Sequence, residues 1–461
     1  MDVAFTETKP LPARKDAIDA HRTLWLAVLV ALALRMVVVG FLYRDQLKPA
    51  NDHWAFGYET GRIARSIVTG KGFSDPLFAG TGPTGMMPPI HTYMVAGVFK
   101  VFGIYSSASA IILLSLNVLF SALTCIPVFF IARKCFGPST AKVSIWVWAL
   151  FPYAILISAT MIWNSCMATF LLAVMFWWTL RLEVSSSVAE WTGFGLFAGF
   201  TVVTSPPVAT VFPFLVAYAC YRRFRRGQRW FWRAAMACLA VVVVMTPWQV
   251  RNYRVFGRFV PMRNNFWSEV WIANNGDESF WTNRAAYPSS SEVEGEQYRR
   301  LGETKYMEVK RRQAIEFISG HPGWVARQTQ RRFAYTWTEF WGTPDHPIHE
   351  PFDPEEPFDP ALVAFCTGLT VLMIIGLRRA FREGLDTRWL FVAALVTIPF
   401  VYYFTRPHIR YRHPVDPQIV MLAVYAFTAR KDAVKGELVG ERGGAKPKAR
   451  ADRVAPSRAN Q

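Results

Sequence analysis

Long apolar runs alternate with short polar connections along most of the chain. Ten of these runs approach the roughly 20 helical residues that cross a hydrocarbon layer about 30 Å thick. They are residues 24–43, 106–132, 140–161, 165–182, 190–204, 206–221, 232–250, 361–378, 388–404 and 412–429. The fifth and sixth runs are short and are divided by Ser205-Pro206-Pro207, which predicts a helical hairpin. The pattern predicts an all-α polytopic membrane protein with about ten transmembrane helices.

The charged residues lie mainly in the short connections. Of 461 residues, 52% are hydrophobic and only 18% are charged, whereas about a quarter of the residues are charged in ordinary soluble proteins. The formal net charge is nevertheless +18. A soluble nucleic-acid-binding protein would spread this charge along a groove or one face. Basic clusters between apolar runs instead indicate a lipid bilayer, and no nucleic acid, as the partner.

The basic clusters also predict an orientation. The first run lacks a small-residue cleavage site, so we expect an uncleaved anchor that starts in the cytoplasm. Every cytoplasmic connection then carries positive charge, as the positive-inside rule requires. These connections contain Arg14, Lys15, Arg22, Arg133, Lys134, Arg181, Arg222, Arg223, Arg225, Arg226, Arg229, Arg378, Arg379 and Arg382. We therefore expect a multi-pass protein of the cell inner (plasma) membrane with both termini in the cytoplasm.

This topology divides the chain into parts with different surroundings. They are a cytoplasmic N-terminal segment 1–23, an N-terminal transmembrane module 24–250 with a first outside loop 44–105, a periplasmic loop region 251–360, C-terminal transmembrane helices 361–430 and a disordered basic cytoplasmic tail 431–461.

The outside segments contain their own helical patterns. An amphipathic helix is predicted from Asn51-Asp52 to about Thr69, with an apolar stripe suited to the membrane interface. A short apolar stretch over 90–102 predicts a tilted surface helix. A polar helix over 294–319 should end at His321-Pro322-Gly323, where an aromatic helix follows.

Two acidic residues of the first outside loop are candidates for a catalytic base. Asp52 and Glu59 are seven residues apart, so on one helix they would emerge on the same side, roughly 10 Å apart. A carboxylate that is partly desolvated at the water–lipid boundary gains proton affinity, which suits it to act as a base. The structural alternatives are a helix cap for Asp52 and an ion pair with Arg62 or Arg65 for Glu59.

Arginines form a second group of candidates at the outer face. Arg251 and Arg254 lie where the seventh run leaves the membrane, and the connection Thr405–Pro414 contains Arg406, Arg410 and Arg412. The planar guanidinium matches phosphate oxygens, so the sequence predicts phosphate binding. Single residues of this kind are also explained by snorkelling beside aromatic side chains.

Other chemical signals are weak. No spacing typical of a metal site, Walker loop, GxSxG or HExxH motif is present. His91, His408 and His413 are scattered, which favours hydrogen-bonded structural histidines. Arg35 lies within the first run, where a buried structural role is favoured over ligand contact. The six cysteines fall in or beside apolar runs, which predicts buried thiols. They are Cys125, Cys135, Cys166, Cys220, Cys238 and Cys366.

Several of these segments together resemble bacterial relatives of the dolichyl-phosphate-mannose–protein mannosyltransferases, over most of residues 24–430. The segments are Asp52, Phe56–Ser66, Gly70-Lys71-Gly72-Phe73-Ser74, Thr81-Gly82-Pro83-Thr84, Pro88-Pro89, Thr246-Pro247-Trp248 with Arg251-Asn252-Tyr253, and Tyr411-Arg412-His413-Pro414.

The resemblance implies a GT-C-type helical bundle, and it suggests that neither a metal nor a cofactor is needed. It also implies an inverting transferase that passes a sugar from a polyprenyl-phosphate donor to a lipid, glycan or protein acceptor outside the cytoplasm. The family's first-loop base corresponds to Asp52, although Asp52-His53 stands where many members have an Asp-Glu pair, and Glu59 is the rival. Arg251, Arg254, Arg410 and Arg412 would hold the donor phosphate. The alternative is a transporter or flippase of lipid-linked saccharide. Transporters usually place ionisable residues within their spans and show repeated halves, whereas here the unusual charges lie mainly at the outer surface and no internal repeat is evident.

Overall fold

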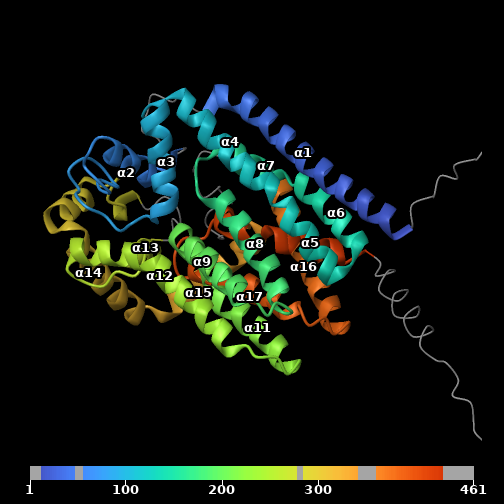
Figure 1. Ribbon diagram of the computed structural model, residues 1–461. Coiled ribbons are helices and arrows are strands. Elements are labelled where there is room, and N and C mark those ends of the chain that lie inside the picture. Colours follow the sequence, from blue (N-terminus) through green and yellow to red (C-terminus); the bar gives the residue numbers. More distant parts are fainter. Residues whose placement is uncertain (1–11, 47–55, 278–283, 341–359, 429–461) are drawn as a thin grey trace, which may run out of the picture.

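The computed structural model describes residues 12–46, 56–277, 284–340 and 360–428, which form helices and their connections (Figure 1). An isolated antiparallel bridge joins Ser74 and Pro83 in the first outside loop. The predicted all-α architecture is confirmed for these ranges.

The apolar helices follow the predicted runs closely. They are α1 (Pro12–Gln46), α4 (Ser107–Leu123), α5 (Cys125–Phe136), α6 (Pro138–Ala149), α7 (Pro152–Thr160), α8 (Ser165–Leu182), α9 (Val188–Thr204), α10 (Pro206–Ala209), α11 (Phe212–Arg225), α12 (Phe231–Phe256), α16 (Pro360–Arg382), α17 (Arg388–Phe400) and α19 (Asp416–Tyr425). The connecting helices are α2 (Glu59–Val68), α3 (Pro89–Phe102), α13 (Phe266–Ala273), α14 (Glu292–Gly320), α15 (Pro322–Thr338) and α18 (Ile409–Arg412). Short 3-10 turns cover Arg284–Ala286, Val401–Tyr403 and His413–Val415.

Fewer helices than predicted are long enough to cross a membrane unbroken. Among the described residues five qualify by length and composition, and the bent pair α6–α7, which turns by 41°, gives a sixth. The five are Asp19–Phe41, Ser107–Phe136, Ser165–Leu182, Phe231–Phe256 and Pro360–Arg382. Prolines divide several other runs, and the last run becomes a full α-helix only at Asp416. A multi-pass membrane protein is therefore supported, while ten full-length spans are not seen.

Small residues decide which helices pack most closely. A Cβ atom on Gly195 of α9 would collide with the carbonyl oxygen of Ala237 in α12, and one on Gly376 of α16 would collide with that of Leu422 in α19. Such contacts let helix backbones approach closely inside a membrane. The predicted hairpin partner of α9 is thus not its principal neighbour, because α9 packs along α12 while α11 lies against α8 and α17.

Arg35 is fully buried in the first span. Its guanidinium donates to Ser121 Oγ at 2.9 Å, to the carbonyl oxygen of Ala149 at 2.7 Å and to that of Trp148 at 3.1 Å. The favoured structural role is confirmed, because this arginine ties α1 to α4 and α6 and satisfies carbonyls at the end of α6.

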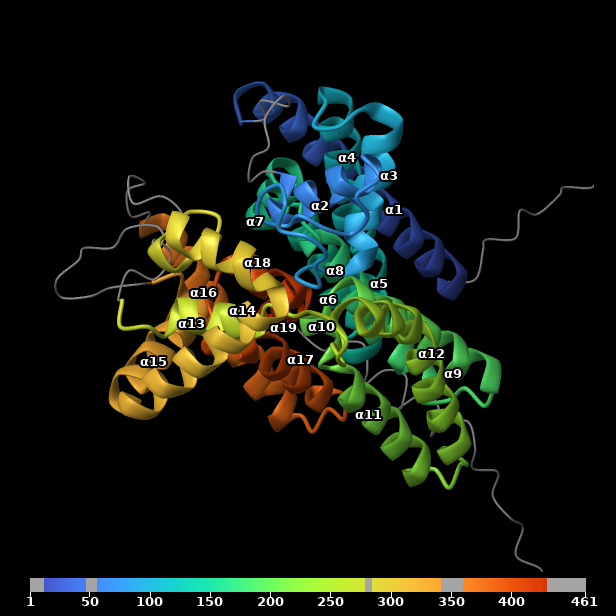
Figure 2. The same ribbon diagram turned by 90° about the vertical axis from the view of Figure 1, so that its left-hand side faces the viewer.

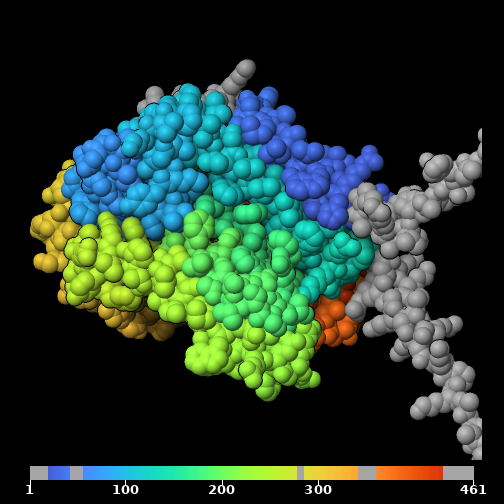
Figure 3. Space-filling view, in the orientation of Figure 1, coloured from blue at the N-terminus to red at the C-terminus, as the bar shows by residue number. Residues whose placement is uncertain are grey.

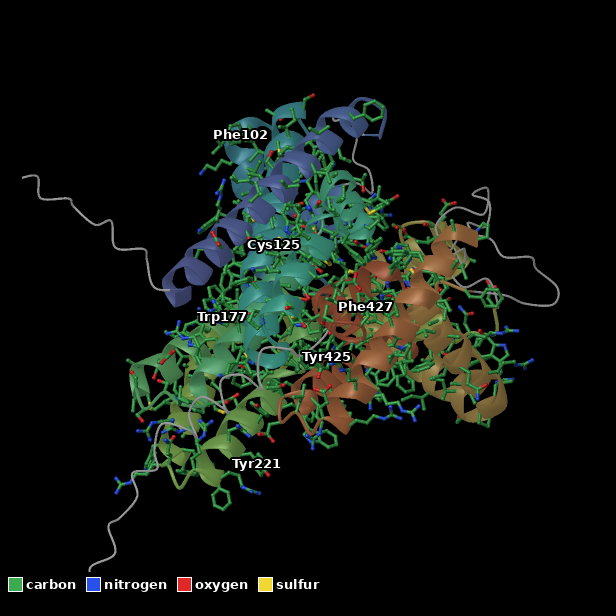
Figure 4. All side chains as sticks on the ribbon, turned by 90° about the vertical axis from the view of Figure 1, so that its right-hand side faces the viewer. Phe102, Cys125, Trp177, Tyr221, Tyr425 and Phe427 are labelled. Carbon is green, nitrogen blue, oxygen red and sulfur yellow. The ribbon has the colours of Figure 1, made fainter. Side chains whose placement is uncertain are left out.

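Basic residues gather at one end of the bundle. Lys134, Arg222 and Arg226 stand 3.7, 3.8 and 3.8 Å from the buried carboxylate of Glu183, so the ends of α5, α8 and α11 meet there. Figure 4 faces this end, with Tyr221 of α11 at its lower edge. These connections were predicted to share the cytoplasmic side, and the structure brings them together.

The connecting helices α2, α3, α13 and α14 lie toward the opposite end (Figures 1 and 2). An apolar cluster that includes Ile63, Phe73, Trp248 and Met262 joins the first loop to α12 and the segment after it. In the space-filling view the first-loop surface accordingly meets the α12–α13 surface (Figure 3). A polar pocket lies where these elements meet the bundle.

Candidate functional site

A pocket of about 300 Å³ lies where the connecting helices meet the bundle. It is bounded by the start of α2, the start of α3, the start of α8, α13 and the connection from α17 to α19. Its polar lining consists of Glu59, His91, Asn164, Arg263, Asn265, Glu269, Tyr287, Tyr402, Arg406, Arg410 and Tyr411, among others. Because α8 spans 18 residues from Ser165 at the pocket to Leu182 beside Glu183, the pocket and the basic end are roughly 27 Å apart.

A sharp backbone turn places Glu59 in this pocket. Gly57 and Tyr58 have φ values of 75° and 46°, so the helix cannot extend backward through them, and α2 begins at Glu59. Gly57 also packs tightly, since a Cβ atom there would stand 2.9 Å from the carbonyl oxygen of Ile162. The prediction of one helix from Asn51-Asp52 to about Thr69 is wrong at this turn. Asp52 itself lies outside the described residues.

Tyr287, in the segment between α13 and α14, donates a hydrogen bond to Glu59 Oε1. Burial, together with the negative charges of Glu59 and Glu269, raises the pKa of Tyr287 well above its usual value. The phenol therefore keeps its proton and orients the Glu59 carboxylate by donating to it.

Arg406 and Glu269 form an ion pair in the pocket wall. Arg406 Nη2 lies 2.7 Å and Nε 3.2 Å from Glu269 Oε2. Burial by itself would raise the pKa of Glu269, but the charge and hydrogen bonds of Arg406, with the charges of Arg263 and Arg410, hold it below its usual range. Glu269 thus stays ionised and fixes the guanidinium.

Two further guanidinium groups complete the cationic lining. Arg263 donates through Nε to the carbonyl oxygen of Met86 at 2.7 Å. Arg410 lies 3.5 Å from the centre of the Trp163 ring and donates to the Tyr411 hydroxyl at 2.6 Å. Stacking on Trp163 holds the planar guanidinium in place.

His408 fixes the backbone beneath Arg410. Its Nδ1 accepts a hydrogen bond of 2.8 Å from the backbone N–H of Arg410 and so caps α18. Burial and the nearby charge of Arg410 lower the pKa of His408 well below its usual value. The neutral ring can therefore accept this bond, which agrees with the structural role expected for it.

Three of the four arginines that the resemblance assigned to the donor phosphate are not brought to the pocket. Arg251 donates to the carbonyl oxygens of Thr84 at 2.7 Å and Phe73 at 2.9 Å, which anchors the first loop on α12. Arg412 is buried and donates to Asp416 at 3.2 Å, and Arg254 is exposed outside the lining. Of the four predicted residues, Arg410 alone lines the pocket.

Sequence reasoning missed Arg263, Glu269 and Tyr287 and did not select Arg406 from its cluster. Glu269 is a single carboxylate in the apolar, aromatic helix Phe266–Ala273, and this contrast is the signal that could have marked it. No local pattern in the sequence marks Arg263 or Tyr287, because only the tertiary fold brings them to the pocket. Among the described residues no group of three or more His, Cys, Asp and Glu side chains is close enough to hold a metal ion.

Comparison with known proteins agrees with the resemblance seen in the sequence. Residues 86–248, about a third of the chain, match the family model of dolichyl-phosphate-mannose-protein mannosyltransferases. AglB from Archaeoglobus fulgidus, an archaeal oligosaccharyltransferase solved with an inhibitory peptide and a dolichol-phosphate, matches with a TM-score of 0.53 and 12% identity. This match covers 93% of the chain and 52% of AglB. The chain has the GT-C fold.

Other structures support the same GT-C fold. The apo form of the A. fulgidus oligosaccharyltransferase matches with a TM-score of 0.51 and 11% identity, over 93% of this chain and 53% of that one. The chain thus spans about half the length of these oligosaccharyltransferases. No curated protein matches its sequence. The predicted GT-C bundle is confirmed.

Proposed function

We propose that this GT-C protein transfers a sugar from a polyprenyl-phosphate donor to an acceptor hydroxyl on the non-cytoplasmic face of the cell inner membrane. The observation that carries the proposal is that one pocket holds the Glu59 carboxylate, oriented by Tyr287, together with three arginines. The match of residues 86–248 to the mannosyltransferase family and the fold shared with AglB support the same reaction class.

The charge of the pocket suits a phosphodiester donor. Its lining contains Arg263, Arg406 and Arg410 against Glu59 and Glu269, which leaves one excess positive charge. A sugar linked through a single phosphate to a lipid carries one negative charge, and the phosphate gains a second when the sugar leaves. Guanidinium groups fixed by Glu269 and Trp163 would stabilise that developing charge without rearranging.

Glu59 would act as the base. In an inverting displacement the acceptor oxygen attacks the anomeric carbon while the bond from that carbon to the phosphate oxygen breaks. The hydroxyl proton passes to the carboxylate, and the polyprenyl phosphate leaves toward the arginines. Tyr287 would hold Glu59 in the orientation that receives the proton. Asp52, which the family resemblance favours for this role, remains the competing base.

The orientation follows from the charges at the two ends. The positive-inside rule assigns the basic end around Glu183 to the cytoplasm. The pocket, roughly one span away along α8, then faces the periplasm. Both termini are proposed to be cytoplasmic.

Transfer from a labelled donor tests the proposal. Purified full-length protein would be given undecaprenyl-phosphate mannose or glucose with a panel of lipid, glycan and peptide acceptors. Sugar transfer is expected, with large losses in Glu59→Gln if Glu59 is the base and in Asp52→Asn if Asp52 is. Full activity of the double variant would exclude a carboxylate base from this loop. Movement of lipid-linked sugar across proteoliposomes without product would favour the transporter alternative.

A further inference from the structure

His91 in the first turn of α3 is a buried side chain in the pocket wall. It is 3% exposed, lines the pocket, and its Nε2 atom has no hydrogen-bond partner. The adjacent Thr92 is different, since its hydroxyl donates to the carbonyl oxygen of Pro88 at 2.9 Å. A buried polar atom left without a partner costs about 1–3 kcal/mol, and such atoms are rare in folded proteins. The imidazole therefore differs from the hydrogen-bonded structural histidine expected from the sequence.

His408 differs from His91 in its hydrogen bonding. Both rings are buried beside the same pocket, but the Nδ1 atom of His408 accepts a hydrogen bond from a backbone N–H group. The described residues supply no equivalent partner to His91 Nε2. Because His91 lines the pocket, a molecule bound there can supply this partner.

The charge state of His91 limits what that partner can be. Burial lowers the pKa of His91 to about 4, so the ring is neutral at physiological pH. A neutral imidazole offers one N–H donor and one acceptor nitrogen, which suits a hydroxyl better than a phosphate. The pocket already provides Arg263, Arg406 and Arg410 for a phosphate.

The size of the pocket points to the sugar. A volume of about 300 Å³ is at the small end of ligand sites and suits a sugar ring with its phosphate. We propose that His91 binds a hydroxyl group of the transferred sugar through Nε2. This inference rests on the proposed function and adds to it a residue that hydrogen-bonds the sugar.

The experiment measures two properties of purified full-length protein, namely its affinity for undecaprenyl phosphate and its kcat/KM with sugar donors. His91→Leu removes the hydrogen-bonding ring at similar volume, and His91→Gln keeps a neutral donor and acceptor. His321→Leu is the matched control, because His321 is exposed at the end of α14 and outside the pocket lining. The probes are undecaprenyl phosphate, which has no sugar, and undecaprenyl-phosphate mannose and glucose.

His91→Leu is expected to bind undecaprenyl phosphate as the wild type does, within about two-fold. Its kcat/KM with the sugar donors should fall about 5- to 50-fold, mainly through KM, because the sugar hydroxyl loses its partner. His91→Gln should recover much of this loss. The melting temperature of the empty His91→Leu protein should not fall, since the removed atom had no partner.

Distinct results would overturn the proposal. Equal kcat/KM for wild type and His91→Leu would remove His91 from sugar binding while leaving the proposed function intact. An equal loss of undecaprenyl phosphate binding, or a melting temperature several degrees lower, would show a phosphate or structural role instead. A wild-type protein that transfers neither sugar would overturn the proposed function, and this inference with it.

Discussion

Glu303 of α14 supports the pocket wall from behind. Its buried carboxylate accepts hydrogen bonds from the Thr84 hydroxyl at 2.5 Å, Gly85 N at 2.8 Å, Asn264 Nδ2 at 3.0 Å and the Tyr298 hydroxyl at 2.9 Å. Thr84 and Gly85 lead directly into the pocket-lining residues 86–88, and Asn264 lies between Arg263 and Asn265. One side chain thus joins the first outside loop to the segment after α12.

The cost of removing this carboxylate follows from its partners. In Glu303→Ala the two hydroxyls can turn toward other acceptors, but the N–H groups of Gly85 and Asn264 cannot. Each buried donor without a partner costs about 1–3 kcal/mol, so two to four such donors lower the free energy of unfolding by about 2–12 kcal/mol. We expect a value in the lower part of this range, because water can enter the space left by the side chain. In Glu303→Gln the amide faces donors on both sides, and an intermediate loss is expected.

Thermal unfolding in detergent, followed together with undecaprenyl phosphate binding, measures this effect. Even the lower limit of about 2 kcal/mol should reduce the melting temperature of Glu303→Ala by about 2 °C, because the unfolding entropy of a chain of 461 residues is large. The displaced loop should also weaken lipid-phosphate binding. Glu296→Ala is the control on the same helix, because its pair with Arg299 is exposed and worth at most about 1 kcal/mol. If Glu303→Ala and Glu296→Ala had the same melting temperature, the Glu303 network would not hold the loop.

Three further predictions concern the pocket and its surroundings. Glu59→Gln should reduce sugar transfer about 100-fold or more, and Tyr287→Phe about 5- to 10-fold through one lost hydrogen bond; unchanged initial rates would contradict these roles. Arg410→Ala should weaken undecaprenyl phosphate binding at least about 10-fold, whereas the exposed Arg254→Ala should change it by less than about two-fold. Comparable losses in the two variants would support the sequence prediction, which assigned both arginines to the phosphate. Burial raises the pKa of Glu339 to about 7, so the folded protein binds this proton more tightly than the unfolded chain, whose pKa is about 4.3. The stability that Glu339 contributes is therefore lost as pH rises from about 4 to 7. In Glu339→Gln the melting temperature should vary less with pH across this range. Parallel curves of melting temperature against pH for wild type and variant would refute this.

Local patterns were enough to predict most helices. Apolar run lengths located α1, α4, α8, α12 and α16, because a helix that faces lipid must be apolar over its whole length. The ends of the shorter helices were less predictable, since a break such as that at Gly57 depends on a close contact with Ile162 far along the chain. The predicted amphipathic helix was correct from Glu59 onward and wrong at the turn of Gly57 and Tyr58.

By itself the sequence determined the membrane-spanning character and the common side of the basic connections, because these depend on composition and local order. It also selected Glu59 as a candidate, but the turn at Gly57 brought this carboxylate to the pocket. The tertiary structure decided which arginines face the pocket. Arg251 and Arg410 are alike in the sequence, but the first meets a carbonyl 167 residues away and the second stacks on Trp163. A guanidinium binds whatever acceptors or rings the fold brings to it, and distant segments supply them.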